Sequence, residues 1–584
     1  MPRRLLLAFS LLVSFVTSAA DPPAEQALSS VIAEYERILK QVDPISAGQE
    51  GDRDALRRWP DVRPGAAREN RMRLEALAGE LAKIDTRELA AGSSLSYALL
   101  ARQIAFDIER LDFDLDRVAF NNDSGFHTLA DYVARTTTLS SREDAEAWLA
   151  RLEALSDYYD QNLANLRRGI RTKLTQPKIV VDRVLDVARR QAATPPDGSA
   201  LLAPFARRPP ALPEADWSRY RSRALALVRE RIRPAQRAFV RFLEQEYGPA
   251  ARPELGLRTV PGGEQMYRFL ARAETTTDLA PDEIHALGLA EVKRIRALME
   301  ETIRETAFSG SFADFLQMLR TDPKFYAQSA EDLMEKASEI AKRADDRLPA
   351  LFWTLPRLPY GVRPVPAEIA EGYTTGRYWS GSLVQGQAGA YMVNTSRLNQ
   401  RPLYELPALT LHEAVPGHHL QIALAQELED LPYFRRNTSP TAFVEGWGLY
   451  AEYLGEEMGM YRDAYERFGR YSYEMWRACR LVADTGIHWL GWGIEEARRC
   501  FTDNSALAPH NIQTELERYV SWPGQALAYK IGELRLRALR ERAERTLRER
   551  FNVREFHDVI LLGGPLPLDV LEGRVRAWLE AKQR

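Results

Sequence analysis

The chain has 584 residues, of which 45% are hydrophobic and 28% are charged, and its formal net charge is -3. This balance is that of an ordinary globular protein, and the length is sufficient for several domains. Because the composition is not strongly basic, it argues against nucleic acid as a partner.

The first twenty residues have the pattern of a secretory signal peptide. Arg3 and Arg4 precede an apolar run over residues 5–16, and small residues follow at 18–20. The run is too short to span a bilayer, and an uncleaved membrane anchor is the alternative. We therefore expect residues 1–20 to be removed on export. The mature protein should then be periplasmic or secreted, without stable membrane insertion.

Amphipathic helices are predicted along most of the remaining chain, because apolar residues recur at spacings of three and four. The clearest examples are residues 27–40, 72–84, 94–111, 144–165 and 216–245. Proline and glycine clusters then suggest a boundary near residue 255. It divides the chain into an N-terminal helical subdomain, 21–255, and a second helical subdomain, 256–584, which we expect to carry the functional site.

The second subdomain is predicted to combine helices with a small β element. We expect a helix from Pro281 to about Arg304, loops over 360–366 and 369–387, and a short strand over 389–395. The predicted fold class is therefore mainly α. The strand immediately precedes the most informative segment of the chain.

Three of the eight histidines fall within residues 412–419, which read HEAVPGHH. Two imidazole ligands with a carboxylate beside them are what a metal-assisted hydrolase requires. His412 is the expected first ligand and Glu413 the expected general base. Zinc lowers the pKa of bound water to roughly 7, and a neighbouring carboxylate can take the proton and later pass it to a leaving amine.

The spacing of these histidines requires a distorted helix. Ligands four residues apart share one face of a regular helix, but here the second imidazole follows the first by six or seven residues. Pro416 clashes with the carbonyl of His412, and Gly417 permits unusual backbone angles, so the turn should bulge. A bulge would return His418 to the face of His412, and we favour His418 as the second ligand. His419 is the alternative, because seven residues restore the face about 10 Å further along.

A third ligand is expected from residues 443–452, which read FVEGWGLYAE. Glu445 lies 26 residues after His419, which leaves room for a helix, a loop and a return. Glu452 lies on the same face, either as an alternative ligand or as a partner that orients a histidine. Gly446 and Gly448 each destabilise a helix by ~1 kcal/mol relative to alanine. Their presence is explained if another backbone approaches the helix closely at these positions. Such a site, with one open position, would bind Zn²⁺.

The two cysteines, Cys479 and Cys500, are 21 residues apart. In an exported protein they could form a disulfide between neighbouring helices or remain buried free thiols, and the sequence leaves both open. Two cysteines cannot build a cysteine-rich zinc site, so any metal site here must use histidine and carboxylate.

These motifs resemble the DUF885 family of bacterial proteins. The resemblance rests on the motif His-Glu-x-x-Pro-Gly-His-His followed by Glu-Gly-Trp. Flanking segments also resemble the family, at residues 282–295, 390–394, 484–488 and 525–533. The family is distantly similar to the gluzincin zinc metallopeptidases, such as thimet oligopeptidase and angiotensin-converting enzyme. This resemblance implies a mostly helical fold with a deep channel and zinc at its floor.

The resemblance also implies roles for residues outside the ligand cluster. A strand beside the metal helix would pair with extended peptide substrate, with Tyr391 to Asn394 as the candidate. His488 and Tyr529 are the candidates for stabilising the oxyanion, and Arg480 for binding a substrate carboxylate. The expected function is that of an exported zinc metallopeptidase. The alternatives are an inactive peptide-binding protein of the same fold and a zinc hydrolase of non-peptide amides or esters. The sequence leaves peptide specificity and oligomeric state open.

Overall fold

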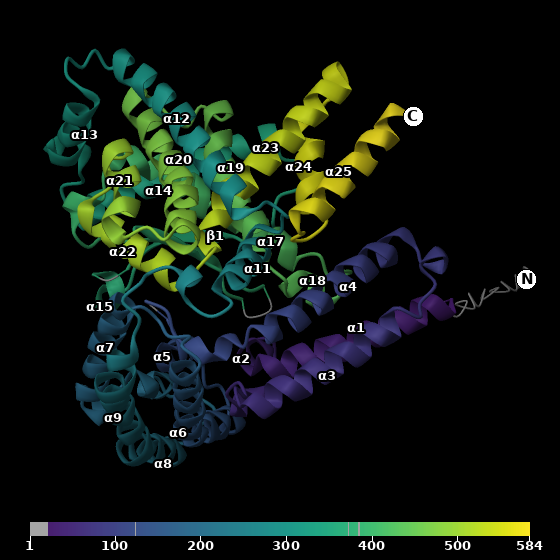
Figure 1. The fold of residues 1–584 in the computed structure, drawn as a ribbon, viewed down its shortest axis with the longest axis vertical. Coiled ribbons are helices and arrows are strands. Elements are labelled where there is room, and N and C mark those ends of the chain that lie inside the picture. Colours follow the sequence, from purple (N-terminus) through teal and green to yellow (C-terminus); the bar gives the residue numbers. More distant parts are fainter. Residues whose placement is uncertain (1–21, 123, 372, 384–385) are drawn as a thin grey trace, which may run out of the picture.

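The computed structural model describes residues 22–584 except 123, 372 and 384–385 (Figure 1). The predicted signal peptide, 1–20, lies outside the described residues. Within the described residues, none of the helices combines the length and the apolar character needed to cross a membrane.

The fold is mainly helical, as predicted, and the helices of the first half form the lower part of Figure 1. The long helices α1, α3 and α4 lie side by side there. The helices of this half are α1 (Pro23–Val42), α2 (Pro44–Gln49), α3 (Pro64–Leu81), α4 (Ala91–Asp112), α5 (Phe126–Thr136), α6 (Arg142–Arg171), α7 (Lys178–Ala193), α8 (Glu214–Leu227), α9 (Arg233–Phe242), α10 (Gly248–Ala250) and α11 (Gly263–Thr275).

The second half begins with the helix predicted over 281–304, which is confirmed as α12 (Pro281–Glu305). Its other helices are α13 (Phe312–Thr321), α14 (Ala330–Leu351), α15 (Ala367–Ala370), α16 (Leu406–Glu413), α17 (His418–Gln426), α18 (Tyr433–Asn437), α19 (Thr441–Glu457), α20 (Ala464–Thr485), α21 (Ile494–Asn504), α22 (Pro509–Ser521), α23 (Ala528–Leu547), α24 (Val553–Leu561) and α25 (Leu568–Gln583).

A small three-stranded sheet accompanies these helices. The strands are β1 (Tyr360–Pro364), β2 (Gly376–Trp379) and β3 (Gly389–Val393), in the order β1-β3-β2. The strand predicted at 389–395 is confirmed as β3, but the prediction of loops over 360–366 and 369–387 is wrong, since both contain a strand. β1 and β2 are short edge strands, and edge positions tolerate the glycine and proline that are typical of loops.

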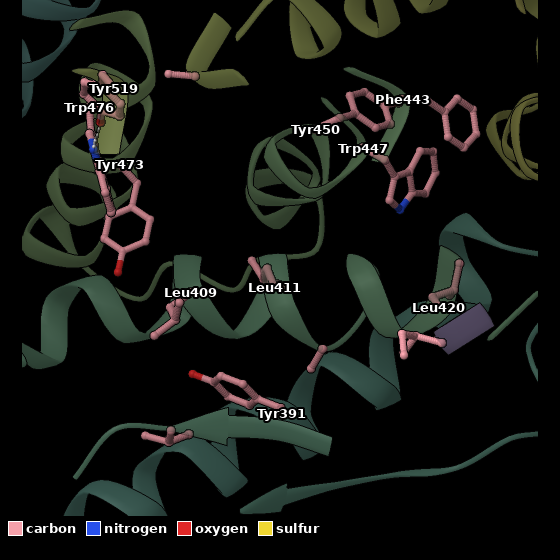
Figure 2. Close-up of a cluster of buried hydrophobic side chains, with 14 of the residues drawn as sticks. Tyr391, Leu409, Leu411, Leu420, Phe443, Trp447, Tyr450, Tyr473, Trp476 and Tyr519 are labelled. Carbon is pink, nitrogen blue, oxygen red and sulfur yellow. Dashed lines mark hydrogen bonds between the residues drawn. The ribbon is translucent and has the colours of Figure 1, made fainter. Parts of the chain in front are cut away.

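Helix α16 lies at the centre of the second half. All eight of its residues are buried. Figure 2 shows Leu409 directed toward Tyr391 of β3, while α19, which carries Trp447 and Tyr450, lies across the opposite side. Because other elements cover α16 on every side, apolar residues occur on all of its faces. The segment therefore lacks the one-sided apolar pattern of a surface helix.

The two predicted subdomains are in contact. Arg183 of α7 forms an ion pair with Glu517 of α22 at 3.0 Å, and the amide of Gln176 donates to the carbonyl of Ser521. Buried hydrophobic residues from both sides of position 255 belong to one continuous cluster. The boundary near residue 255 therefore stays a prediction.

Cys479 and Cys500 form a disulfide, with their Cα atoms 5.6 Å apart. The bond joins α20 to α21, which is the arrangement of neighbouring helices that the spacing of 21 residues permits. The alternative of two free thiols is therefore wrong for this structure.

Candidate metal centre

Three side chains from separate helices meet at one point. His412 lies near the end of α16, His418 begins α17, and Glu445 lies near the start of α19. Nε2 of His412 is 3.4 Å from Oε2 of Glu445, and Nε2 of His418 is 3.5 Å from the same oxygen. The three ligand atoms all lie within 4.8 Å of one another, so the cluster is a candidate metal site.

These separations fit a tetrahedral zinc ion. Zn–N and Zn–O bonds of about 2.0–2.1 Å place neighbouring ligand atoms about 3.3 Å apart at the corners of a tetrahedron. Two histidines and one glutamate are also a ligand set of catalytic zinc sites, in which the fourth position stays open. The Glu445 side chain is 20% exposed, whereas that of His412 is 3% exposed. The cluster is therefore covered on the His412 side and reachable from the Glu445 side.

The charges in the cluster favour a cation at its centre. Burial by itself would lower the pKa of His412, but hydrogen bonds to Glu445 and Glu452 outweigh burial and raise this pKa to about 10. Burial would raise the pKa of Glu445, but its contacts with His412 and His418 hold it well below the usual value. A proton is thus retained among these groups, and a divalent metal would take its place.

Glu452 orients His412 from behind. Its Oε1 is 2.8 Å from Nδ1 of His412, the ring nitrogen on the side away from Glu445, and both side chains are buried. A carboxylate there accepts the Nδ1–H and leaves the lone pair of Nε2 facing the cluster. Arg477 of α20 contacts the same carboxylate oxygen at 3.3 Å. Of its two predicted roles, Glu452 has the geometry of the orienting partner.

The helix is interrupted between the two candidate histidine ligands, where the sequence predicts a bulge. Helix α16 ends at Glu413 and α17 begins at His418. The indole N–H of Trp447 donates to the carbonyl of Pro416 at 2.7 Å, so the broken turn still has a buried hydrogen-bond donor. The Glu-Gly-Trp motif thus supplies both a candidate ligand and the support for the break.

His419 is not part of the cluster. Its Nδ1 is 3.0 Å from the hydroxyl of Tyr378, and its ring packs at 4.6 Å against the ring of Tyr360. Burial lowers its pKa to about 4, so the ring is neutral. Because the break restarts the helix at residue 418, His418 faces His412 and Glu445 while His419 faces the sheet.

The two glycines beside Trp447 permit close approaches, as predicted. A Cβ added to Gly446 would lie 2.5 Å from Cα of Gly532, where α19 crosses α23. A Cβ added to Gly448 would lie 2.7 Å from Cε1 of His412. Both distances are far shorter than a carbon–carbon contact of 3.5–4.0 Å. Gly448 therefore leaves room for the candidate ligand.

Glu413 is held by the edge of the sheet. Its Oε2 accepts a hydrogen bond of 2.7 Å from the backbone N–H of Tyr378 in β2. The pairing of β2 with β3 turns this N–H away from β3 and toward α16. The side chain is 8% exposed, and its charge acts on His412. One carboxylate oxygen is therefore fixed, while the other is left for a reacting proton.

The prediction that β3 pairs with substrate is wrong, because β3 is the central strand and both of its edges are occupied. Tyr391 is fully buried, and its hydroxyl accepts from Thr410 at 3.3 Å. The side-chain amide of Asn394 donates to the carbonyl oxygen of residue 370, at the end of α15, and to those of residues 373 and 374 in the loop before β2. The edge strand beside the metal helix is β2.

The prediction that His488 stabilises an oxyanion is also wrong. Its Nδ1 accepts from the backbone N–H of Leu257, and its Nε2 donates to the carbonyl of Tyr519 at 2.9 Å. The residue is fully buried, and burial lowers its pKa to about 3. Both ring nitrogens are therefore used to join backbone segments, and neither is free for a substrate.

Tyr529 and Arg480 belong to a second buried network. The Tyr529 hydroxyl accepts from Arg518 at 3.1 Å, and the Arg480 guanidinium lies 4.1 Å above the Tyr529 ring. Arg480 also forms an ion pair with Glu515 at 2.9 Å. Its charge is therefore already matched, which argues against a role in binding a substrate carboxylate. Tyr529 is 7% exposed, and its hydroxyl donates to none of the described residues.

Sequence reasoning missed two residues that position the cluster. The backbone of Tyr378 fixes Glu413, and Arg477 contacts the carboxylate that orients His412. Nothing in the glycine- and tyrosine-rich segment around residue 378 distinguishes a strand from a loop. The residue pattern around Arg477 predicts only that it lies on a helix. It gives no sign of its partner, Glu452, which is 25 residues away in the chain.

Comparison with known proteins places the chain among bacterial proteins. A crystal structure described as "the putative lipoprotein from Colwellia psychrerythraea" superposes with a TM-score of 0.90 at 26% identity, covering 96% of this chain and 99% of that one. A "putative lipoprotein of unknown function" from Shewanella oneidensis has a TM-score of 0.71 at 17% identity, covering 94% and 99%, and this likeness concerns the fold alone. No curated protein matches.

The family model for "Bacterial protein of unknown function (DUF885)" matches residues 44–575. This span contains the histidine cluster, Glu445 and the helices that support them. The chain therefore belongs to the DUF885 family.

Proposed function

We propose that this protein is an exported zinc-dependent peptidase. The observation that carries the proposal is the meeting of His412, His418 and Glu445 at separations of 3.4 and 3.5 Å, which fit a tetrahedral ion. Glu413 beside this cluster adds the base that a hydrolase requires. The predicted signal peptide supplies the argument for export, and the predicted deep channel would give substrate access.

Zn²⁺ held by these residues would supply Lewis-acid chemistry, which polarises a carbonyl and acidifies water. The protein's own contribution begins with orientation. Glu452 fixes His412 through Nδ1, and the N–H of Tyr378 fixes one oxygen of Glu413. The free oxygen of Glu413 can then accept a proton from attacking water and deliver it to the leaving amine.

The edge of β2 that faces away from β3 packs on α16, and the N–H of Tyr378 at this edge donates to Glu413. Tyr529, whose hydroxyl donates to none of the residues that the structure describes, is the remaining candidate for oxyanion support.

Metal analysis together with a peptide-library digest tests this proposal. The purified protein should contain about one zinc ion per chain and should cleave peptides. Glu413→Gln should abolish cleavage while zinc is retained, because the base is lost and the ligands are intact. Glu429→Gln is the matched control, since that side chain is 80% exposed.

Unchanged turnover in Glu413→Gln would falsify the assignment of the base. Peptide binding without any turnover in the wild-type protein would favour the inactive peptide-binding alternative. Hydrolysis of simple esters or amides with no cleavage of peptides would favour the alternative of a non-peptide hydrolase.

A further inference from the structure

His419, the last histidine of the Pro-Gly-His-His motif, is buried beside the candidate metal centre without belonging to it. Only 2% of the residue is exposed. Its ring donates a hydrogen bond to the backbone carbonyl of Leu358, in the segment that leads into β1. Its Nδ1 is 3.0 Å from the hydroxyl of Tyr378 in β2. The ring therefore ties α17 to β2 and to the segment before β1.

The direction of these hydrogen bonds follows from the groups involved. A carbonyl oxygen can only accept, so the ring donates its proton to Leu358. Because Nδ1 faces the hydroxyl of Tyr378, this proton is carried by Nε2, and Nδ1 accepts the hydroxyl proton. The hydroxyl oxygen in turn accepts from the backbone N–H of Gly381, in the turn after β2. The side chain of Tyr378 is thus held from two directions.

The same tyrosine holds the candidate base through its backbone. The N–H of Tyr378 donates to Oε2 of Glu413 at 2.7 Å. In an extended strand the side chain stands roughly perpendicular to the sheet, whereas the N–H lies in its plane. One residue of β2 can therefore contact α16 with its N–H and α17 with its hydroxyl. Tyr378 connects Glu413 on the first helix to His419 on the second.

This connection spans the point at which the metal helix is interrupted. In an unbroken helix, hydrogen bonds between residues four apart would fix Glu413 relative to the next turn. Here α16 ends at Glu413, and the N–H of His419 reaches the carbonyl of Ala414, five residues back, at 3.1 Å. Turns of this wider kind are rare and lie mostly at functional sites. A contact with a third element therefore helps to set the relation between the two helices.

Gly389 of β3 leaves room for the hydrogen bond between Tyr378 and His419. A Cβ added to Gly389 would overlap the hydroxyl oxygen of Tyr378 and would lie 2.9 Å from Cε2 of that ring. It would also lie 3.0 Å from Nδ1 of His419. Ordinary carbon contacts are 3.5–4.0 Å, so a side chain at this position would push the two groups apart.

We propose that His419 is a positioning residue for the candidate base: through the hydroxyl of Tyr378 it holds the backbone N–H that fixes one oxygen of Glu413. This inference rests on the proposed peptidase function. It gives the two adjacent histidines of the motif separate tasks, because His418 is a candidate ligand and His419 supports the base. Displacing a reacting group by about 1 Å can cost about a hundredfold in rate, so loss of this support should appear in kcat.

Two substitutions of His419 separate its two hydrogen bonds. Asparagine places an oxygen where Nδ1 lies, so His419→Asn can still accept from Tyr378. Glutamine places its amide where Nε2 lies, so His419→Gln can still donate to Leu358 but lacks the acceptor for Tyr378. We expect His419→Asn to keep kcat for peptide cleavage within about threefold of the wild type, and His419→Gln to lose about tenfold or more.

Two further readouts accompany these rates. KM should be little changed in both variants, because the support acts on the chemical step. Zinc content should also stay the same, because the three candidate ligands are intact. Equal losses of kcat in His419→Asn and His419→Gln would overturn the positioning role, since the bond to Tyr378 would then not be the cause.

Tyr378→Phe tests the same bond from its other end. It removes the hydroxyl and keeps the backbone N–H, and it should lower kcat as much as His419→Gln does. The double variant should lose no more than either single variant, because both changes remove one hydrogen bond. Tyr360→Phe is the matched control, since the Tyr360 ring packs 4.6 Å from that of His419 while its hydroxyl bonds Asp345. Equal losses in the two tyrosine variants would overturn the proposal.

Hydrogen exchange tests the positioning role without any enzyme activity. The backbone amide of Tyr378, resolved by fragmentation in a mass spectrometer, should exchange about tenfold faster in His419→Gln than in wild type or His419→Asn, because it is held less firmly on Glu413. Unchanged exchange in His419→Gln would overturn the positioning role and leave the peptidase proposal intact. Faster exchange with no peptide hydrolysis by the wild type would support the hold on Glu413 and overturn the peptidase.

Discussion

Glu452→Gln should weaken zinc binding without removing a ligand. The glutamate carboxylate accepts the Nδ1–H of His412 at 2.8 Å and is 1% exposed. Glutamine has the same shape, so its amide oxygen can still accept that proton, but the negative charge is gone. The imidazole becomes a weaker donor of its Nε2 lone pair to the metal, and its orientation is less firmly held.

The size of this effect follows from the hydrogen bond. Bonds to a charged group contribute about 1.5–3 kcal/mol and neutral ones about 0.5–1.5, so the loss is about 1–1.5 kcal/mol, or about tenfold in affinity. Changes to such outer partners typically cost 10–100-fold in metal affinity. The substitution also leaves Arg477, 3.3 Å from the lost charge, without its partner, which should lower the free energy of unfolding by about 3 kcal/mol.

Competition with a chromogenic chelator measures the zinc affinity, and urea unfolding of the metal-free protein measures the stability. Glu445→Gln is the comparison variant, and it should weaken zinc binding more than Glu452→Gln because it removes a ligand. Equal affinities for wild type and Glu452→Gln would refute the orienting role. A loss equal to that of Glu445→Gln would instead make Glu452 a direct ligand.

Three further substitutions test the supports of the site and the fold. Gly448→Ala would place a Cβ 2.7 Å from His412, so zinc affinity in the same chelator assay should fall, whereas Gly79→Ala, with open space around it, should leave it unchanged. Cys500→Ser removes a disulfide that closes a loop of 21 residues and should lower the free energy of unfolding by about 3 kcal/mol in denaturant titrations; no change would show that the bond is absent. Burial lowers the pKa of His488 to about 3 in the folded state, whereas the pKa in the unfolded state is about 6.5. Between these two pH values only the unfolded state binds the proton, so the free energy of unfolding falls as the pH drops below about 6.5. His488→Gln should therefore lose less stability than wild type between pH 7.5 and pH 5, by about 2 kcal/mol, when both are unfolded without metal; equal losses would contradict the buried neutral ring.

The amino-acid sequence by itself was sufficient to pick out the three residues of the candidate metal site. Metal ligands must be particular residue types, and His412, His418 and Glu445 stand out because histidine is scarce and proline interrupts the helix between them. Local rules also predicted the break at Pro416, the helical texture of the chain and the β3 strand. These features depend on neighbours within a few residues, where propensity and periodicity are informative.

Tertiary structure decided everything that depends on distant partners. Whether His418 or His419 joins the cluster, and whether Glu452 is a ligand or a support, follows from how α17 and α19 pack on α16. The edges of β3 and both ring nitrogens of His488 are occupied by residues remote in the chain, which local sequence does not specify. Whether a buried polar group already has hydrogen-bond partners depends on the whole fold. The partners of His488 therefore exclude it from oxyanion stabilisation, although a histidine is chemically suited to that role.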